Sequence, residues 1–223
     1  RYEAVPSWPN MPRYWTFGMA SDGAVNSDDE IHILSRGAHP LTIWDTDGNF
    51  ISSWGENTVS ANPHGIYIAP NDNVWLVDRD YHTATEYTPG GKPLLELGEK
   101  HVPSPTFYGM PFNMPSALAI APNGDFFVAD GDYGSRVVHF SKDGEFIKVI
   151  GGTKGSGPGE FDVPHAVALD SQGRLLVADE QPASNKPRIQ VFDQDGTFIE
   201  QWADIGLSLP TGLAVGPDGT VYV

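Results

Sequence analysis

The sequence predicts an all-β protein built from repeated four-stranded antiparallel units. Three observations support this fold class. A proline-led apolar strand recurs at intervals of about 50 residues, and each copy runs into a turn rich in Asn, Asp and Gly before a second apolar strand. No segment shows sustained helical periodicity. Units of this kind, arranged around an axis, are the blades of a β-propeller.

The repeat begins with a less regular copy over residues 20–54. Later copies open with the aligned segments Pro63–Pro70, Pro115–Pro122, Pro164–Ser171 and Pro210–Pro217. Hairpin turns such as Asn123-Gly124 connect the expected strands within a copy, because Asn and Gly accept the positive φ angles that tight hairpins require. Two Asp-x-Asp-Gly segments, at residues 45–48 and 193–196, resemble fragments of a calcium loop but stand where hairpin turns are required. We therefore interpret them as turns.

The C-terminal end of the sequence falls within a repeat. Val221-Tyr222-Val223 aligns with Leu176-Val177-Ala178, in the second strand of the preceding copy. We expect residues 1–223 to form one incomplete propeller domain of about four and a half blades that stops inside its fifth blade. A propeller closes into a ring because an open end exposes an unpaired blade face. The expected missing part is therefore C-terminal.

Composition narrows the classes of partner. The chain carries 13 Lys and Arg against 29 Asp and Glu, a formal net charge of −16, which repels nucleic acids and anionic membrane surfaces. No apolar run is long enough for a membrane span. We expect a soluble monomer that takes a small-molecule or peptide substrate and binds neither nucleic acid nor membrane. The absence of cysteine leaves the compartment open between cytoplasmic and exported, with a removed leader compatible with both.

One position of the repeat carries candidate chemistry. The residue after each repeat proline should point at the mouth of the central channel, and it is His64, Ser116, His165 and Thr211 in successive copies. In a six-bladed ring, continued alternation would place a third histidine in the sixth blade. Three imidazoles around an axis form an open tripodal site that suits Zn²⁺. The alternative is that each histidine simply bonds a neighbouring backbone carbonyl.

Several segments together resemble one family of propellers. The sequence contains Ser35-Arg36-Gly37-Ala38-His39-Pro40, the two Pro-His positions, Asp130-Gly131-Asp132-Tyr133 and Gly157-Pro158-Gly159-Glu160-Phe161. At this repeat length the chain resembles NHL-repeat propellers, and in particular peptidyl-α-hydroxyglycine α-amidating lyase and its bacterial relatives. The resemblance implies a six-bladed ring, zinc held by three histidines and a structural calcium in the channel. It also implies a tyrosine and arginines around the metal, and a reaction that cleaves an N-linked carbinol to an amide and glyoxylate.

The resemblance assigns roles to particular residues. His64 and His165 match two zinc ligands, with the third expected beyond Val223. Arg36 matches an arginine that binds or polarises the substrate. The backbone carbonyls of Gly23 and Ile66 match positions that face the calcium. Tyr133 is the nearest counterpart of the family tyrosine, displaced by one position, so that either Tyr133 or Asp132 takes the catalytic place.

The sequence departs from the family at a second place. After Val177-Ala178-Asp179 the family has an arginine, whereas this chain has Glu180. This substitution reverses the charge offered to a substrate carboxylate. Arg79, at the corresponding position of an earlier repeat, would restore positive charge if it faced the site. Two functions follow: a zinc-dependent, amidating-lyase-like enzyme acting at the channel mouth, or a non-catalytic NHL propeller that binds a peptide, glycan or protein.

Overall fold

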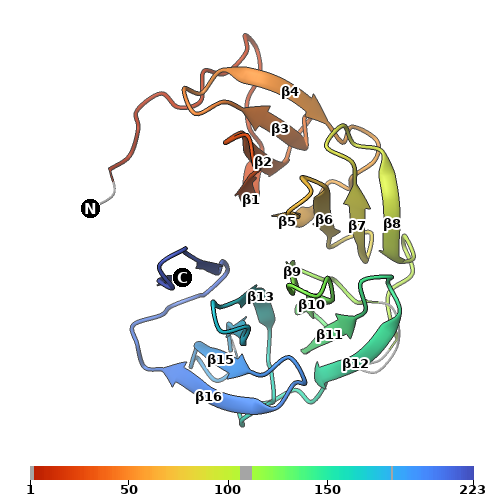
Figure 1. Cartoon of the computed structure of the whole chain (residues 1–223), viewed down its shortest axis with the longest axis vertical. Helices are drawn as coiled ribbons and strands as arrows, with labels where there is room; N and C mark the ends of the chain where they lie inside the picture. Colours follow the sequence, from red (N-terminus) through yellow and green to blue (C-terminus); the bar gives the residue numbers. More distant parts are fainter. Residues whose placement is uncertain (1–2, 106–111, 182) are drawn as a thin grey trace.

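The computed structural model describes residues 3–105, 112–181 and 183–223. These residues form four sheets of four antiparallel strands and one two-stranded sheet, with consecutive strands hydrogen-bonded as neighbours. Figure 1 shows the sheets fanned around a common centre, each with its first strand innermost. The prediction of an all-β propeller with four-stranded antiparallel blades is confirmed.

The blades follow the order of the sequence. Their strands are β1 (Met19–Val25), β2 (Ile31–Arg36), β3 (Leu41–Trp44) and β4 (Phe50–Trp54); β5 (Pro63–Ile68), β6 (Val74–Asp78), β7 (Thr83–Tyr87) and β8 (Pro93–Gly98); β9 (Ala117–Ile120), β10 (Phe126–Asp130), β11 (Arg136–Phe140) and β12 (Phe146–Gly151); and β13 (Pro164–Leu169), β14 (Leu175–Asp179), β15 (Arg188–Phe192) and β16 (Phe198–Ala203). The two-stranded sheet is β17 (Ala214–Val215) with β18 (Val221–Tyr222). The described residues thus form four complete blades and part of a fifth, and not the six that the resemblance implies.

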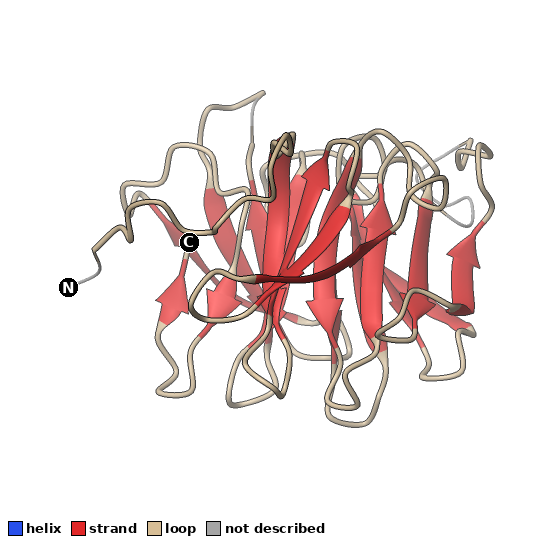
Figure 2. Ribbon diagram, turned by 90° about the horizontal axis from the view of Figure 1, so that it is seen from above, coloured by secondary structure: helices blue, strands red, loops and turns tan. Residues whose placement is uncertain are grey.

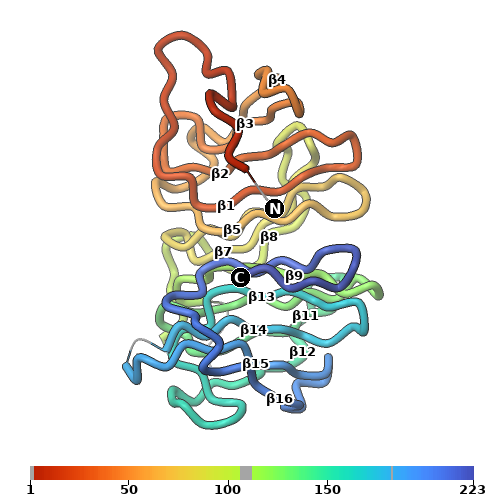
Figure 3. The backbone as a smooth tube through the Cα atoms, turned by 90° about the vertical axis from the view of Figure 1, so that its left-hand side faces the viewer, coloured from red at the N-terminus to blue at the C-terminus, as the bar shows by residue number. Residues whose placement is uncertain are grey.

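The strands run between two opposite faces, where the connecting loops lie (Figure 2). The described residues include no helix, and hence no helix long and apolar enough to cross a membrane. In the tube view the successive blades lie side by side, and the β17–β18 sheet lies beside β13 (Figure 3). The first strands of the four complete blades, β1, β5, β9 and β13, therefore follow one another as neighbours around the centre.

The apolar cores lie between neighbouring blades. One cluster joins Trp75 and Val77 of the second blade to Phe126 and Val128 of the third, with the Trp75 and Phe126 rings 4.8 Å apart. Similar clusters join the first blade to the second, the third to the fourth, and the fourth to the β17–β18 sheet. Both faces of the middle strands are therefore buried, which explains why their sequences are continuously apolar.

The turns have the expected geometry. Gly48 and Gly196 take φ angles of 82° and 79°, in the left-handed region that glycine occupies most readily. In each turn the glycine amide donates to the carbonyl of the first aspartate, Asp45 or Asp193. The interpretation of the two Asp-x-Asp-Gly segments as hairpin turns is confirmed.

Candidate functional site

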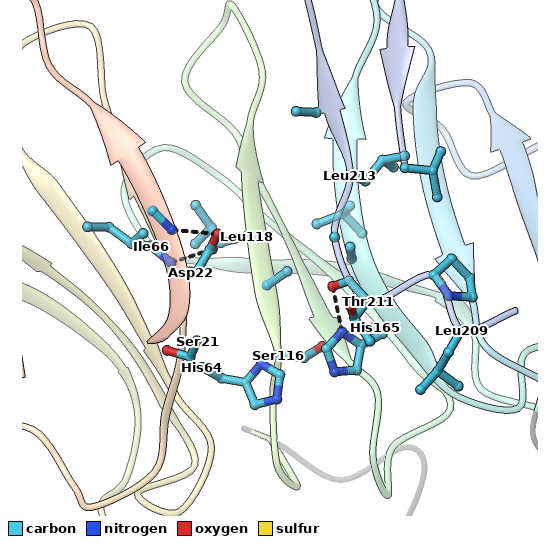
Figure 4. Close-up of a pocket in the computed structure, with 18 of the residues that line it drawn as sticks. Ser21, Asp22, His64, Ile66, Ser116, Leu118, His165, Leu209, Thr211 and Leu213 are labelled. Carbon is cyan, nitrogen blue, oxygen red and sulfur yellow. Dashed lines mark hydrogen bonds between the residues drawn. The ribbon is translucent and has the colours of Figure 1, made fainter. Parts of the chain in front are cut away.

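The innermost strands enclose a channel cleft of about 1010 Å³ (Figure 4). Its walls come from β1, β5, β9, β13 and the segment leading into β17. The site predicted from the repeat lies here, since His64 and His165 both line the cleft. Each blade contributes the same strand positions to the cleft wall, so residues at equivalent positions of successive blades can be compared.

A backbone irregularity directs the first set of side chains into the channel. The β1–β2, β5–β6 and β13–β14 ladders each shift register at one residue, which leaves Ser21, His64 and His165 without a cross-strand partner. A bulged residue of this kind bends its strand and re-aims its side chain. Ser116 and Thr211 hold the same position ahead of β9 and β17, and all five residues line the cleft. We call these five residues the mouth ring.

The two histidines of the mouth ring lie close together. Their ring centroids are 4.6 Å apart, and the ring planes are inclined at 64°. His165 Nδ1 lies 2.9 Å from the carbonyl oxygen of Thr211. Because a carbonyl only accepts hydrogen bonds, Nδ1 carries the proton, and in the neutral ring Nε2 keeps its lone pair. A backbone carbonyl that accepts a hydrogen bond from the other ring nitrogen commonly orients a metal-binding imidazole.

The histidine of the second blade is neutral near pH 7. Burial, which is the largest cause, together with the nearby His165 and Arg36 lowers the pKa of His64 to about 4. A neutral imidazole has a lone pair to offer a metal ion. The two histidines therefore fit as two nitrogen donors of a zinc site. Among the described residues, however, no group of three His, Cys, Asp or Glu side chains is arranged to hold a metal ion.

A second set of corresponding positions follows the second strand of each blade. Counted from the hairpin turns, the register makes Arg36, Arg79, Gly131 and Glu180 equivalent in blades one to four. We call these four residues the rim ring. At Gly131 a Cβ atom would lie 2.3 Å from the carbonyl oxygen of Pro164, so the third blade can place no side chain there. The charged members are therefore two arginines and one glutamate.

The two arginines differ in their partners. Arg79 donates its Nε–H to Asp132 and lies 3.2 Å from a carboxylate oxygen of Asp80. Arg36 lines the cleft, and its Nε–H lies 3.4 Å from the carbonyl oxygen of Pro63. No carboxylate of the described residues forms an ion pair with Arg36. The charge of Arg79 is thus matched by acidic neighbours, whereas Arg36 faces the cleft with its charge available.

Glu180 also lines the cleft, and its side chain is 13% exposed. Its Oε1 atom lies 3.8 Å from His165 Nε2. Burial raises the pKa of Glu180, His165 opposes that shift, and the negative charge of Asp132 adds to it. The substitution noted in the sequence therefore falls directly beside one of the two candidate zinc ligands.

The predicted proton acceptors lie apart from the cleft wall. Tyr133 is 61% exposed, and neither Tyr133 nor Asp132 is among the cleft-lining residues. Asp132 is engaged by Arg79, so it contributes a paired carboxylate near the rim. The structure brings Arg36, His64 and His165 together but leaves Tyr133 pointing to solvent.

The predicted calcium positions lie deeper in the same cleft. Gly23 and Ile66 line it at equivalent places of β1 and β5. Between them lies Asp22, which accepts hydrogen bonds from the amides of Gly23 at 2.8 Å and Ile66 at 3.0 Å. The surrounding walls raise the pKa of Asp22 by desolvation, and these two amides oppose the shift. An aspartate beside two backbone positions fits the oxygen-only ligands that Ca²⁺ prefers.

Sequence reasoning missed Ser21 and Asp22. The first blade lacks the proline that marks the later repeats, so no sequence motif identifies its mouth position. Counting back from the β1–β2 hairpin would have identified both residues, since Val25 pairs with Ile31 as Ile68 pairs with Val74.

Comparison with known proteins agrees with this architecture. Residues 161–192 match the NHL repeat model. Human NHL repeat-containing protein 3 is 33% identical over 236 residues, an alignment that covers 100% of this chain and 66% of the human protein. Peptidyl-alpha-hydroxyglycine alpha-amidating lyase 1 of Drosophila melanogaster is 35% identical over 173 residues, covering 73% of this chain and 31% of that protein. The chain thus spans less than two thirds of each of these relatives.

A solved structure of similar fold is the catalytically inactive H270A virginiamycin B lyase from Staphylococcus aureus. It superposes with a TM-score of 0.66 at 18% identity, covering 94% of this chain and 64% of that one. At this identity the likeness concerns the fold alone. Together, the blades, the repeat match and the sequence relatives place the chain among the NHL-repeat β-propellers, with a resemblance to the peptidyl-α-hydroxyglycine α-amidating lyases.

Proposed function

We propose that the protein is a zinc-dependent lyase that acts on a small carbinol-type or peptide-derived substrate at the channel mouth. The observation that supports this most is the pair of imidazoles His64 and His165, with ring centroids 4.6 Å apart in a cleft that also contains Arg36. The proposal includes a six-bladed ring, in which a third histidine of the mouth ring would complete the zinc site. The named lyases among the relatives make a catalytic role reasonable.

The reaction proposed is cleavage of an N-acyl-α-hydroxyglycine. The hydroxyl loses its proton, its oxygen forms a carbonyl with the same carbon, and the carbon–nitrogen bond breaks with its electron pair going to nitrogen. The nitrogen then takes a proton, so that the products are an amide and glyoxylate. Such a reaction needs a group that holds the carboxylate and a group that accepts the hydroxyl proton.

The residues present would divide this work. Arg36 would bind the substrate carboxylate, because its guanidinium faces the cleft without a described carboxylate partner. His64 and His165 would hold Zn²⁺, which when bound would supply Lewis-acid polarisation of the hydroxyl oxygen. Tyr133 or Asp132 remains our proposal for the proton acceptor. Gly23 and Ile66, through their carbonyls, and Asp22 would hold a structural Ca²⁺.

A second function is favoured by one specific observation. Tyr133 is 61% exposed, beside Asp132 whose charge is paired with Arg79, which suits a surface that binds another molecule better than a preformed catalytic base. In that case the protein would be a non-catalytic NHL propeller that binds a peptide, glycan or protein on its loop face.

Metal content and turnover distinguish the two functions. Full-length protein should contain zinc by elemental analysis, His64→Ala and His165→Ala should lose most of it, and His101→Ala, in an exposed loop, should keep it. The zinc-loaded protein should release glyoxylate from N-benzoyl-α-hydroxyglycine. The metal site would be refuted if the wild-type protein contained no zinc, or if His64→Ala and His165→Ala both kept their full zinc content. A zinc-loaded protein that releases no glyoxylate would refute the reaction.

A further inference from the structure

The charged side chains that line the cleft differ in how many hydrogen bonds and ion pairs the protein provides for them. The cleft-lining residues include one guanidinium, Arg36, and two carboxylates, Asp22 and Glu180. Asp22 accepts two backbone amide hydrogen bonds, which stabilise its negative charge from within the protein. The carboxylate of Glu180 accepts no comparable hydrogen bond from the described residues, and no described Lys or Arg forms an ion pair with it.

The imidazole that lies beside Glu180 makes no hydrogen bond to its carboxylate. The separation of 3.8 Å between Glu180 Oε1 and His165 Nε2 is too long for a hydrogen bond. His165 donates its Nδ1–H to the Thr211 carbonyl and not to the carboxylate. Within the described residues, Glu180 therefore has no side-chain hydrogen-bond donor that compensates its charge. A cation supplied from outside the chain would do so.

Glu180 and Arg36 place charges of opposite sign in the same cleft. Both belong to the rim ring, in the fourth and first blades, and both line the same cleft. The rim thus offers a positive charge on one side and a negative charge on the other. A ligand with one charge of a single sign would satisfy only one of them.

We propose that the cleft selects a dipolar substrate, with its carboxylate on Arg36 and an ammonium or guanidinium group on Glu180. This inference rests on the proposed function, because it names the substrate class of the same site. For an N-acyl-α-hydroxyglycine the cation belongs to the side chain of the preceding residue, so peptides with Arg or Lys there are the preferred class. Glu180 is then a specificity-determining residue that contacts substrate.

Two matched dipeptides test this by binding alone. N-acetyl-arginyl-glycine and N-acetyl-citrullyl-glycine have nearly the same shape and the same carboxylate, but only the first carries a cation, and neither has the hydroxyl that would react. In calorimetric titrations of the zinc-loaded full-length protein, the arginyl probe should bind about tenfold more tightly. Glu180→Gln should abolish this difference, and Glu180→Arg should reverse it. Asp143→Asn, which removes an exposed charge elsewhere, should keep it.

The outcomes separate this inference from the function on which it rests. Equal binding of the two probes to wild type, or an unchanged preference in Glu180→Gln, overturns the inference whether or not the protein releases glyoxylate. A preference that Glu180→Gln removes supports it even without turnover. Zinc content is measured on every variant: if Glu180→Gln loses zinc as His165→Ala does, the carboxylate serves the metal, and the inference is wrong.

Discussion

Arg79, after β6, donates its Nε–H to Asp132, after β10, so an ion pair joins the second and third blades at the channel rim. Both side chains are partly exposed, and exposed pairs are weakened by solvent. A double-mutant cycle with Arg79→Gln and Asp132→Asn should give a coupling of about 0.5–1 kcal/mol in urea unfolding. The same cycle on the exposed Lys142–Asp143 pair should give almost none. Zero coupling between Arg79 and Asp132 would show that the contact does not persist in solution.

A second ion pair lies inside the third blade and should matter far more. Arg136 and Asp130 have side chains that are 0% exposed, with 2.9 Å between Arg136 Nη2 and the Asp130 carboxylate. Removing Arg136 leaves the buried Asp130 carboxylate without its cationic partner, and breaking a buried ion pair in this way costs about 3–5 kcal/mol. Arg136→Met should lower the free energy of unfolding by about that amount. Arg174→Met, which removes a more exposed arginine paired with Asp170 and Glu200, should cost about 1 kcal/mol or less. Similar losses of unfolding free energy in Arg136→Met and Arg174→Met would show that burial does not determine how much each ion pair contributes to stability.

The repeat made much of this fold predictable. Pro63 and Pro164 start β5 and β13, and the histidine after each proline occupies a bulge that turns it into the channel. Local sequence carries this information, because the proline, the apolar run and the glycine turn all lie within one copy. Strand order and the two histidines of the cleft could therefore be deduced without coordinates.

Contacts between blades could not be deduced in the same way. The repeat position of Arg79 would let it restore positive charge near the site if it faced the site, but its guanidinium is paired with Asp132, 53 positions later in the chain. Asp22 was missed because its amide partner on Ile66 lies 44 positions away, in the next blade. Both relationships depend on how neighbouring blades are rotated and packed, which the period of the repeat does not specify.

The close approach of the third and fourth blades depends on a glycine. A Cβ atom at Gly131 would lie 2.3 Å from the carbonyl oxygen of Pro164, and backbone atoms cannot move aside as a side chain can. Gly131→Ala should therefore lower the free energy of unfolding by about 1–3 kcal/mol, measured with urea. The matched control is Gly90→Ala, where a Cβ atom meets nothing within 4 Å, so stability should stay equal or rise slightly. If Gly131→Ala left the free energy of unfolding unchanged, the third and fourth blades could move apart without loss of stability.

The last prediction concerns His32, on β2 of the first blade. The side chain is 2% exposed, and neither ring nitrogen has a hydrogen-bond partner among the described residues. Burial lowers the pKa of His32 below its ordinary value of 6.5, while Glu30 and Asp72 oppose the shift. The unfolded chain therefore takes up a proton at this residue more readily than the folded chain. Stability from the neutral ring is complete above the unfolded pKa and is lost as the pH falls from there toward the folded pKa.

His32→Leu removes this proton linkage. As the pH falls below 6.5, the unfolding free energy of the wild type should decrease more steeply than that of the variant, measured by urea unfolding at each pH. The comparison isolates His32, because every other titrating group is common to the two proteins. His101→Leu, in an exposed loop, should follow the wild-type pH dependence. Parallel pH curves for wild type and His32→Leu would show that His32 is solvated or paired in solution, contrary to its place in the first blade.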